Sequence, residues 1–197
     1  MGQKGVQVAK LYFYYAAMNA GKSTVLLQSA YNYKERGMDT LLLTPALDVR
    51  FGKSKIASRI GLEAMATTFS PEDDLYSYVE AAHKANPKLQ CVLVDEAQFL
   101  TKQQVQQLTD IVDRLDLPVL AYGLRSDFKG EPFEGSLYLL ILADNLLEIK
   151  TICFCGKKAT MNARVDAEGN ILRTGAQVQI GGNESYTAMC RRHFKGL

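Results

Sequence analysis

The sequence lacks several features that would assign it to a specialised class of protein. No apolar run approaches the roughly 20 residues that a membrane-spanning helix needs. It also has no internal repeats, no low-complexity tracts and no long runs of like charge. Its 23 Lys and Arg residues nearly balance its 21 Asp and Glu residues. The resulting net charge of +2 predicts neither a nucleic-acid-binding surface nor membrane association.

Disulfide bonds are not expected either. The chain has only four cysteines, and its first residues do not have the pattern of a signal peptide. We therefore expect a soluble cytoplasmic protein whose cysteines are thiols or metal ligands. With 197 residues, 47% of them hydrophobic, the chain can bury a sizeable core. One domain, or one domain plus a small appendage, is expected.

A stretch near the N-terminus has the pattern of a phosphate-binding P-loop. An apolar run over residues 8–15 predicts a strand, and a helical pattern follows over residues 25–37. Between them, Lys22 would reach the β- and γ-phosphates of a nucleotide, and the Ser23 hydroxyl would bind Mg²⁺. Ala16 stands where the motif has its first Gly, and a chance Gly-Lys-Ser at a helix start is the alternative. The predicted ATP-binding loop comprises Ala16, Ala17, Met18, Asn19, Ala20, Gly21, Lys22, Ser23 and Thr24.

A second candidate motif lies in the middle of the chain. Four apolar residues, 91–94, precede Asp95 and Glu96, which is the form of a Walker B strand. Asp95 would support Mg²⁺, directly or through water, and Glu96 would take a proton from a nucleophile. Acidic residues after a strand are common, so this signal is weak alone. It becomes strong in combination with Lys22 and Ser23.

The remaining pattern predicts an α/β fold, in which helices cover both faces of a parallel sheet. Ligands bind at the carboxyl ends of parallel strands, so Lys22, Asp95 and Leu124 are expected on one rim. The basic stretch 48–61 is expected to be a loop, most simply a solvated connector. Further strands are expected over residues 40–45, 117–122 and 146–152, with helices over 72–84, 101–115 and 137–143.

The tail of the chain has the residues of a metal site. Cys153 and Cys155 are followed by Cys190 and His193. Three thiolates and an imidazole in two short-spaced pairs suit a closed, tetrahedral, structural Zn²⁺ site. Four unrelated residues are the alternative, because Cys-x-Cys is a less common spacing than Cys-x₂-Cys. The remaining cysteine, Cys91, is most simply a buried apolar residue.

Between the two metal-ligand pairs, the chain makes an excursion that is either a lid over the phosphate rim or a zinc ribbon on the surface. A turn at residues 166–169 predicts a hairpin, and residues 178–183 predict a strand that runs into a flexible loop. We expect a P-loop domain over residues 1–150 and a zinc-binding domain over residues 151–197.

Together these motifs predict a phosphotransferase that uses a Mg-nucleotide. With a small-molecule hydroxyl as acceptor, the protein is a kinase. With water as acceptor, it is an ATPase that uses its zinc region to bind nucleic acid. Glu96 suits both, whereas the short chain and the nearly balanced charge favour the kinase.

Four segments closely resemble the type II thymidine kinases of the bacterial kind: residues 18–24, 95–99, 122–128 and 180–186. The resemblance extends over nearly the whole chain, in order. It implies a P-loop, RecA-like parallel sheet with a small C-terminal zinc-containing lasso domain. It also implies transfer of the ATP γ-phosphoryl group to the 5′-hydroxyl of thymidine and deoxyuridine. A homotetramer and feedback inhibition by dTTP are further implications.

The resemblance also implies roles for individual residues. Glu96 matches the general base, and Ala97 and Gln98 continue the ATP-binding segment. Residues 177–181 correspond to the family's lasso, whose backbone binds the thymine base. The implied substrate-binding residues are Met18, Asp48, Arg50, Gln98, Phe99, Leu124, Phe128, Phe133, Gln177, Val178, Gln179, Ile180, Gly181 and Tyr186.

Overall fold

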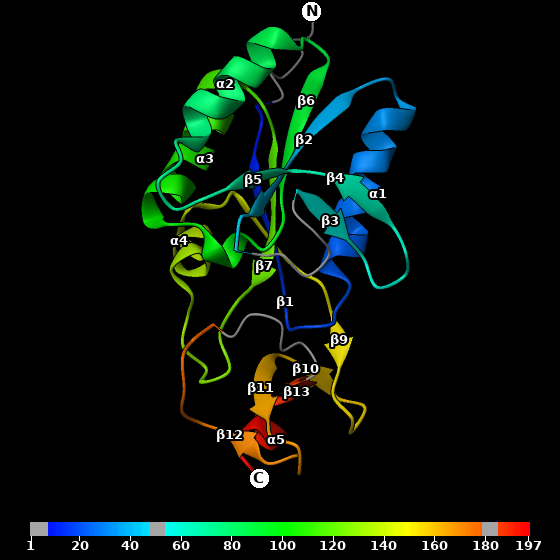
Figure 1. Cartoon of the computed structure of the whole chain (residues 1–197), viewed down its shortest axis with the longest axis vertical. Helices are drawn as coiled ribbons and strands as arrows, with labels where there is room; N and C mark the ends of the chain where they lie inside the picture. The colour runs from blue at the N-terminus through cyan, green and yellow to red at the C-terminus, as the bar shows by residue number, and fades with distance from the viewer. Residues whose placement is uncertain (1–7, 48–53, 179–184) are drawn as a thin grey trace, which may run out of the picture.

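A computed structural model describes residues 8–47, 54–178 and 185–197 of the chain. A six-stranded sheet with the strand order β5-β2-β6-β7-β1-β8 forms the centre of the larger, N-terminal part (Figure 1). All of its strand pairs are parallel, as the sequence predicts. The strands are β1 (Leu11–Ala16), β2 (Asp39–Pro45), β5 (Thr67–Phe69), β6 (Leu89–Val94), β7 (Val119–Leu124) and β8 (Asn145–Glu148).

Helices cover both faces of this sheet, because its central strands bury side chains on both sides. Residues 91–94 of β6, for example, are all fully buried. Two separate hydrophobic clusters result, one on each face. Helices α2 (Leu75–Ala85), α3 (Lys102–Leu115) and α4 (Glu134–Leu142) cover one face, and α1 (Lys22–Glu35) covers the other (Figure 1).

The predicted start of α3 is confirmed. The Thr101 hydroxyl accepts a hydrogen bond from the Gln104 backbone N–H, and the Gln104 side chain accepts one from the Thr101 N–H, each at 3.1 Å. This capping box satisfies two N–H groups that have no partner within the helix. The apolar face of α3 is buried against the sheet at Leu108, Ile111 and Val112.

The expected loop over residues 48–61 is only partly correct. Residues 48–53 lie outside the described part of the chain, but β3 (Lys55–Ala57) pairs with β4 (Glu63–Met65) in an antiparallel hairpin. Ile56 is 2% exposed and belongs to the cluster on the α1 side. The prediction failed here because a strand of three residues in a basic stretch gives too short a signal.

The single strand expected over residues 146–152 is also wrong. Strand β8 ends at Glu148, and the Ile149 N–H donates to the Tyr15 carbonyl at 2.9 Å. After exposed Lys150, β9 (Thr151–Ile152) leaves the large sheet and pairs with β10 (Lys158–Ala159). The apolar run therefore belongs to two sheets, which its hydrophobicity alone could not indicate.

The C-terminal part has its own small core and a second sheet of order β12-β11-β13. The predicted turn at residues 166–169 is confirmed, because the Asp166 N–H donates to the Asn170 carbonyl between β11 and β12. None of the described helices is long and apolar enough to cross a membrane. The elements of this part are β11 (Met161–Val165), β12 (Ile171–Leu172), β13 (Tyr186–Met189) and α5 (Arg191–Phe194).

Candidate active site

The loop between β1 and α1 lies at the carboxyl edge of the large sheet. Gly21, which precedes the helix, has a φ of 86°, a conformation in which a side chain would be strained. Lys22 begins the helix and is only 8% exposed. Ala16, in place of the motif's first Gly, ends β1 and is buried beside β7. Backbone N–H groups at the start of α1 make this loop a suitable anion site.

Two acidic residues follow β6 at the same edge. The Ser23 hydroxyl donates to an Asp95 carboxylate oxygen at 3.2 Å, and the other oxygen accepts from the Glu96 N–H at 3.0 Å. Burial, followed by the charge of Glu96, raises the pKa of Asp95 to about 7, although Lys22 and Ser23 oppose the shift. A cation beside Asp95 would offset the cost of burying its negative charge, so the electrostatics of this carboxylate suit a Mg²⁺ ligand.

Gln98 connects the acidic residues to β7. It lies in η1 (Ala97–Phe99), where its side-chain N–H₂ donates to the Glu96 carboxylate and its oxygen accepts from the Leu124 N–H at 3.0 Å. A Cβ at Gly123 would lie 3.0 Å from both the backbone nitrogen and the side-chain oxygen of Gln98. Glycine at this position therefore lets Gln98 pack closely against β7. Glu96 and Leu124 are thereby held at fixed positions on one rim.

These residues surround one cavity of about 250 Å³. The P-loop, Asp95, Glu96 and Leu124 line it, as the sequence predicts. Part of its wall, however, comes from the β3–β4 hairpin, which sequence reasoning treated as a connector. Its basic residues were the only available signal, because nothing in their spacing indicates a binding wall. The residues that line the cavity are Met18, Asn19, Gly21–Thr24, 55–60, Asp95, Glu96 and Leu124.

The aromatic residues predicted to enclose a substrate form two pairs. Phe99 and Phe133 meet edge to face, with ring centroids 5.8 Å apart, and Phe128 meets Tyr186 at 6.5 Å. Phe128 is only 1% exposed and Phe133 only 7%. Of the predicted lasso, residues 177–181, the structure describes Gln177, which donates to Asp127 at 3.2 Å, and Val178, which is 39% exposed. Asp48, Arg50, Gln179, Ile180 and Gly181 lie outside the described residues.

Sequence reasoning missed Arg164, which organises the second aromatic pair. Its guanidinium lies 3.9 Å from the centroid of the Phe128 ring and is buried beneath Tyr186. Its Nε donates to the Tyr186 hydroxyl at 2.9 Å, and its Nη2 donates to the Ala176 carbonyl at 3.0 Å. Arg164 therefore joins Phe128, Tyr186 and the chain leading into the predicted lasso. No local sequence motif indicates this role.

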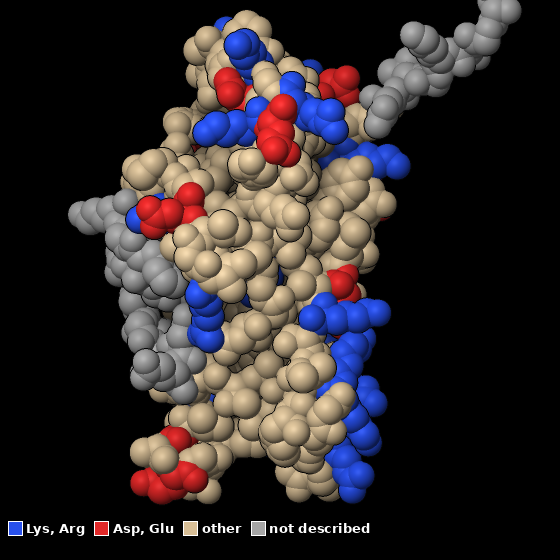
Figure 2. Space-filling model, turned by 90° about the vertical axis from the view of Figure 1, so that its right-hand side faces the viewer, with Lys and Arg blue, Asp and Glu red and all other residues tan. Residues whose placement is uncertain are grey.

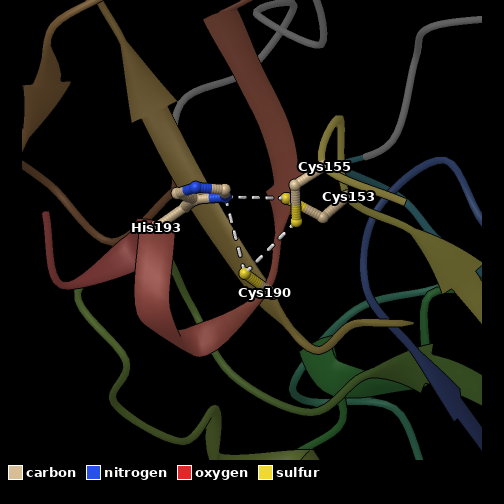
Figure 3. A group of neighbouring side chains, drawn as sticks. All are labelled: Cys153, Cys155, Cys190 and His193. Atoms are coloured by element: carbon tan, nitrogen blue, oxygen red, sulfur yellow. Dashed lines mark hydrogen bonds between the residues drawn. The ribbon is translucent and has the colours of Figure 1, made fainter. Parts of the chain in front are cut away.

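The four predicted metal ligands converge in the C-terminal part (Figure 3). Their ligand atoms all lie within 4.8 Å of one another. Cys155 and Cys190 sulfurs are 3.9 Å apart, and the His193 Nδ1 lies 3.3 Å from the Cys153 sulfur. These separations fit tetrahedral Zn²⁺, whose bonds to sulfur are about 2.3 Å long.

The electrostatics of the cluster also suit a metal ion. Burial opposes ionisation of the Cys153 thiol. Hydrogen bonds from the backbone N–H groups of Cys155 and Cys190, and from His193, outweigh this effect and lower the Cys153 pKa to about 6. The thiolate is the form that binds metals, so the lowered pKa of Cys153 favours metal binding.

A P-loop beside a Walker B aspartate, on the rim of a parallel sheet, defines an α/β protein of the P-loop class. Comparisons with known proteins narrow this class. The sequence model of the family described as "Thymidine kinase" matches residues 9–194. A thymidine kinase of Shewanella oneidensis is 62% identical over 188 residues, which are 95% of this chain and 97% of that protein. One of Coxiella burnetii is 60% identical over 95% of this chain and 96% of that protein.

The chain therefore belongs to the thymidine kinase family and is an enzyme of that family. Among solved structures, the Pif1 helicase from Candida albicans is 15% identical, with a TM-score of 0.43, over 74% of this chain and 36% of that chain. A likeness at that level carries no argument about the function.

The raised pKa of Asp95 predicts a pH-dependent stability difference for Asp95→Asn. The wild-type pKa of about 7 lies above its ordinary value of 3.8, so the folded protein loses stability as the pH rises through this window. Without Mg²⁺ and nucleotide, we expect the variant to unfold at a higher temperature than wild type at pH 8. Each kcal/mol corresponds to about 2–4 °C in a chain of this size.

The advantage of Asp95→Asn should shrink as the pH is lowered from 8 to 5, as measured by thermal unfolding. Asp113→Asn, at an exposed position of α3, controls for the loss of one negative charge. An equal difference in unfolding temperature at both pH values would contradict the proposed cost of burying the Asp95 charge.

Proposed function

We propose that this enzyme transfers the γ-phosphoryl group of Mg-ATP to the 5′-hydroxyl of thymidine, and of deoxyuridine, producing the nucleoside 5′-monophosphate and ADP. The observation that carries the proposal is the Ser23–Asp95 hydrogen bond beside buried Lys22 in a single cavity. Membership of the family and the printed names of its relatives support thymidine as the acceptor.

The phosphate side of the cavity would hold the nucleotide. Lys22 would contact the β- and γ-phosphates, and Ser23 and Asp95 would hold Mg²⁺, which neutralises charge on the phosphates. The backbone of residues 16–21 and Thr24 would complete the loop around the phosphates, and Ala97 and Gln98 would support it from η1. Phosphoryl transfer depends mostly on positioning and charge stabilisation, both of which a rigid loop provides.

Glu96 is the proposed general base. It lines the same cavity as Lys22 and Met18, and Gln98 orients its carboxylate. As the 5′-oxygen bonds to the γ-phosphorus, its proton would pass to Glu96 and the bond to the ADP oxygen would break. Met18 and Leu124 also line this cavity, and the nucleoside would contact them there.

The nucleoside would be enclosed by residues beyond β7 and in the C-terminal part. Leu124, Phe128 and Tyr186 would surround it, and the backbone of residues 177–181 would bind the base as the family's lasso does. Phe99, Phe133, Asp48 and Arg50 are further proposed contacts. In this proposal, residues 1–150 carry the phosphate chemistry, and residues 151–197 form the lid.

Zn²⁺ is the proposed structural ion of the C-terminal part, and Cys153, Cys155, Cys190 and His193 would hold it. Support comes from ligand atoms that all lie within 4.8 Å of one another. We expect Cys190→Ser to lose bound zinc, to unfold at a lower temperature and to raise the KM for thymidine, because β13 would no longer be fixed to residues 153–155.

Metal analysis, thermal unfolding and kinetics test the zinc proposal together. Cys91→Ala is the matched control, because it removes a buried thiol in β6, far along the chain from the cluster. It should retain zinc. Stoichiometric zinc with an unchanged KM in Cys190→Ser would remove the structural role.

The resemblance to the bacterial enzymes supports three further proposals: a homotetramer, feedback inhibition by dTTP, and cytoplasmic action without a nucleic-acid partner. Each is a property of the family that we extend to this chain. Sedimentation and inhibition assays on the purified protein test the first two directly.

Glu96→Gln should separate chemistry from nucleotide binding. The variant loses the proton acceptor, so we expect kcat to fall by about 10²- to 10⁴-fold. The Kd for Mg-ATP should stay within a few-fold of wild type, since the phosphate loop is unaltered. Glu72→Gln, at an exposed position before α2, is the control for a Glu-to-Gln change. Unchanged turnover of Glu96→Gln would exclude Glu96 as the base.

A product analysis tests the function itself. The wild-type protein would be incubated with Mg-ATP and either thymidine, deoxyuridine, deoxycytidine or deoxyadenosine, and the phosphorylated product identified by mass. We expect dTMP and dUMP only. Figure 2 shows Lys and Arg side chains gathered along one edge of the C-terminal part, so a parallel incubation contains DNA. ADP formed without any nucleotide product, and faster with DNA, would instead favour the ATPase.

A further inference from the structure

Asn162, which neither motif contains, makes hydrogen bonds to two distant parts of the chain. It lies on β11 in the C-terminal part and is 3% exposed. Its Oδ1 accepts from the Met18 N–H at 2.7 Å, across 144 positions of sequence. Its Nδ2 donates to the Ser126 carbonyl at 2.8 Å. One buried amide therefore joins three segments.

The two partners of Asn162 lie in different loops beside the cavity. Met18 belongs to the loop that would hold the phosphates, whereas Ser126 lies two residues after Leu124, which lines the cavity. Met18 itself also lines the cavity. Asn162 therefore bridges the two loops just beyond the point where β1 and β7 pair at Ala16 and Leu124.

The strand that carries Asn162 is fixed by the cysteine cluster. Asn162 pairs with Ala188 of β13, and Met161 pairs with Met189, the residue before Cys190. Ala163 of β11 is fully buried in the same small core as Cys153 and Cys190. A continuous set of contacts thus runs from the candidate metal site through β13 and β11 to the P-loop.

We propose that Asn162 is a positioning residue. It holds the phosphate loop, which contains Met18, and the loop after β7, which contains Ser126, at the separation that phosphoryl transfer requires. This inference rests on the proposed function. Buried amide groups cannot turn to water when a partner is removed, so losing Asn162 leaves the Met18 N–H and the Ser126 carbonyl unpaired. The loops then shift. A misplacement of about 1 Å between reacting groups can cost about 10²-fold in rate.

The test compares Asn162→Leu, which has a similar volume but cannot hydrogen-bond, with Asn162→Ala, which a crowded site tolerates more easily. Asn170→Ala is the matched control: it removes a side-chain amide from the same part of the chain, which, among the described residues, bonds to Asp166 within its own turn. For each zinc-loaded protein, kcat and the KM values for ATP and thymidine are measured, together with the unfolding temperature.

We expect both Asn162 variants to lose about 10- to 100-fold in kcat, with KM values within about threefold of wild type. Asn170→Ala should match wild type in kcat. Wild-type kcat in Asn162→Leu or Asn162→Ala would overturn the proposal, as would an equal loss in Asn170→Ala. A loss of kcat that is fully explained by unfolded or zinc-free protein would also overturn it.

Hydrogen exchange provides a readout that does not depend on the reaction. In the folded Asn162→Ala protein, the P-loop amides of residues 17–20 should exchange faster than in wild type, and those of β6 should not. Unchanged P-loop exchange would refute the role of Asn162. Absence of dTMP formation by the wild-type enzyme in the same assays would refute the proposed function instead, so the two failures are distinguishable.

Discussion

The hydrogen bond between Ser23 and Asp95 is the contact on which the site depends. It joins the start of α1 to the end of β6, two elements that the parallel sheet brings to one edge. Asp95 is buried beside Glu96, so two carboxylates share a small volume with Lys22. Lys22 can offset only one of the two negative charges, so a further cation would be favourable here. The acidic rim therefore suits Mg²⁺, the cation that accompanies a bound nucleotide.

Positioning in this protein relies on a few side-chain amides. Gln98 links Glu96 to Leu124, and Asn162 links Met18 to Ser126. Each amide both donates and accepts, so it fixes the distance between two backbone segments in a way that apolar packing does not. The large sheet supplies the approximate placement of the loops, and these amides define it more closely.

Much of the fold was predictable, because its signals are local. The P-loop, the capping box at Thr101 and the acidic end of β6 can each be read from a short stretch of sequence. The contact between Asn162 and Met18 cannot, since it spans 144 positions and involves an ordinary asparagine. The hairpin at Ile56 was missed although its strands pair locally, because β3 is too short to give a strand signal. The division of residues 146–152 between two sheets was missed because β8 pairs with remote β1, whereas β9 pairs with nearby β10.

The pairing of Cys155 with Cys190 has a consequence for how related chains could vary. The two residues lie side by side although 35 positions separate them. The entropy of closing such a loop grows only with the logarithm of its length, so doubling it costs about 0.6 kcal/mol. The residues between β12 and β13 can therefore be lengthened or shortened while the anchored ends, and the large sheet beyond them, keep their stability. Sequence changes can accumulate there without the core being rebuilt.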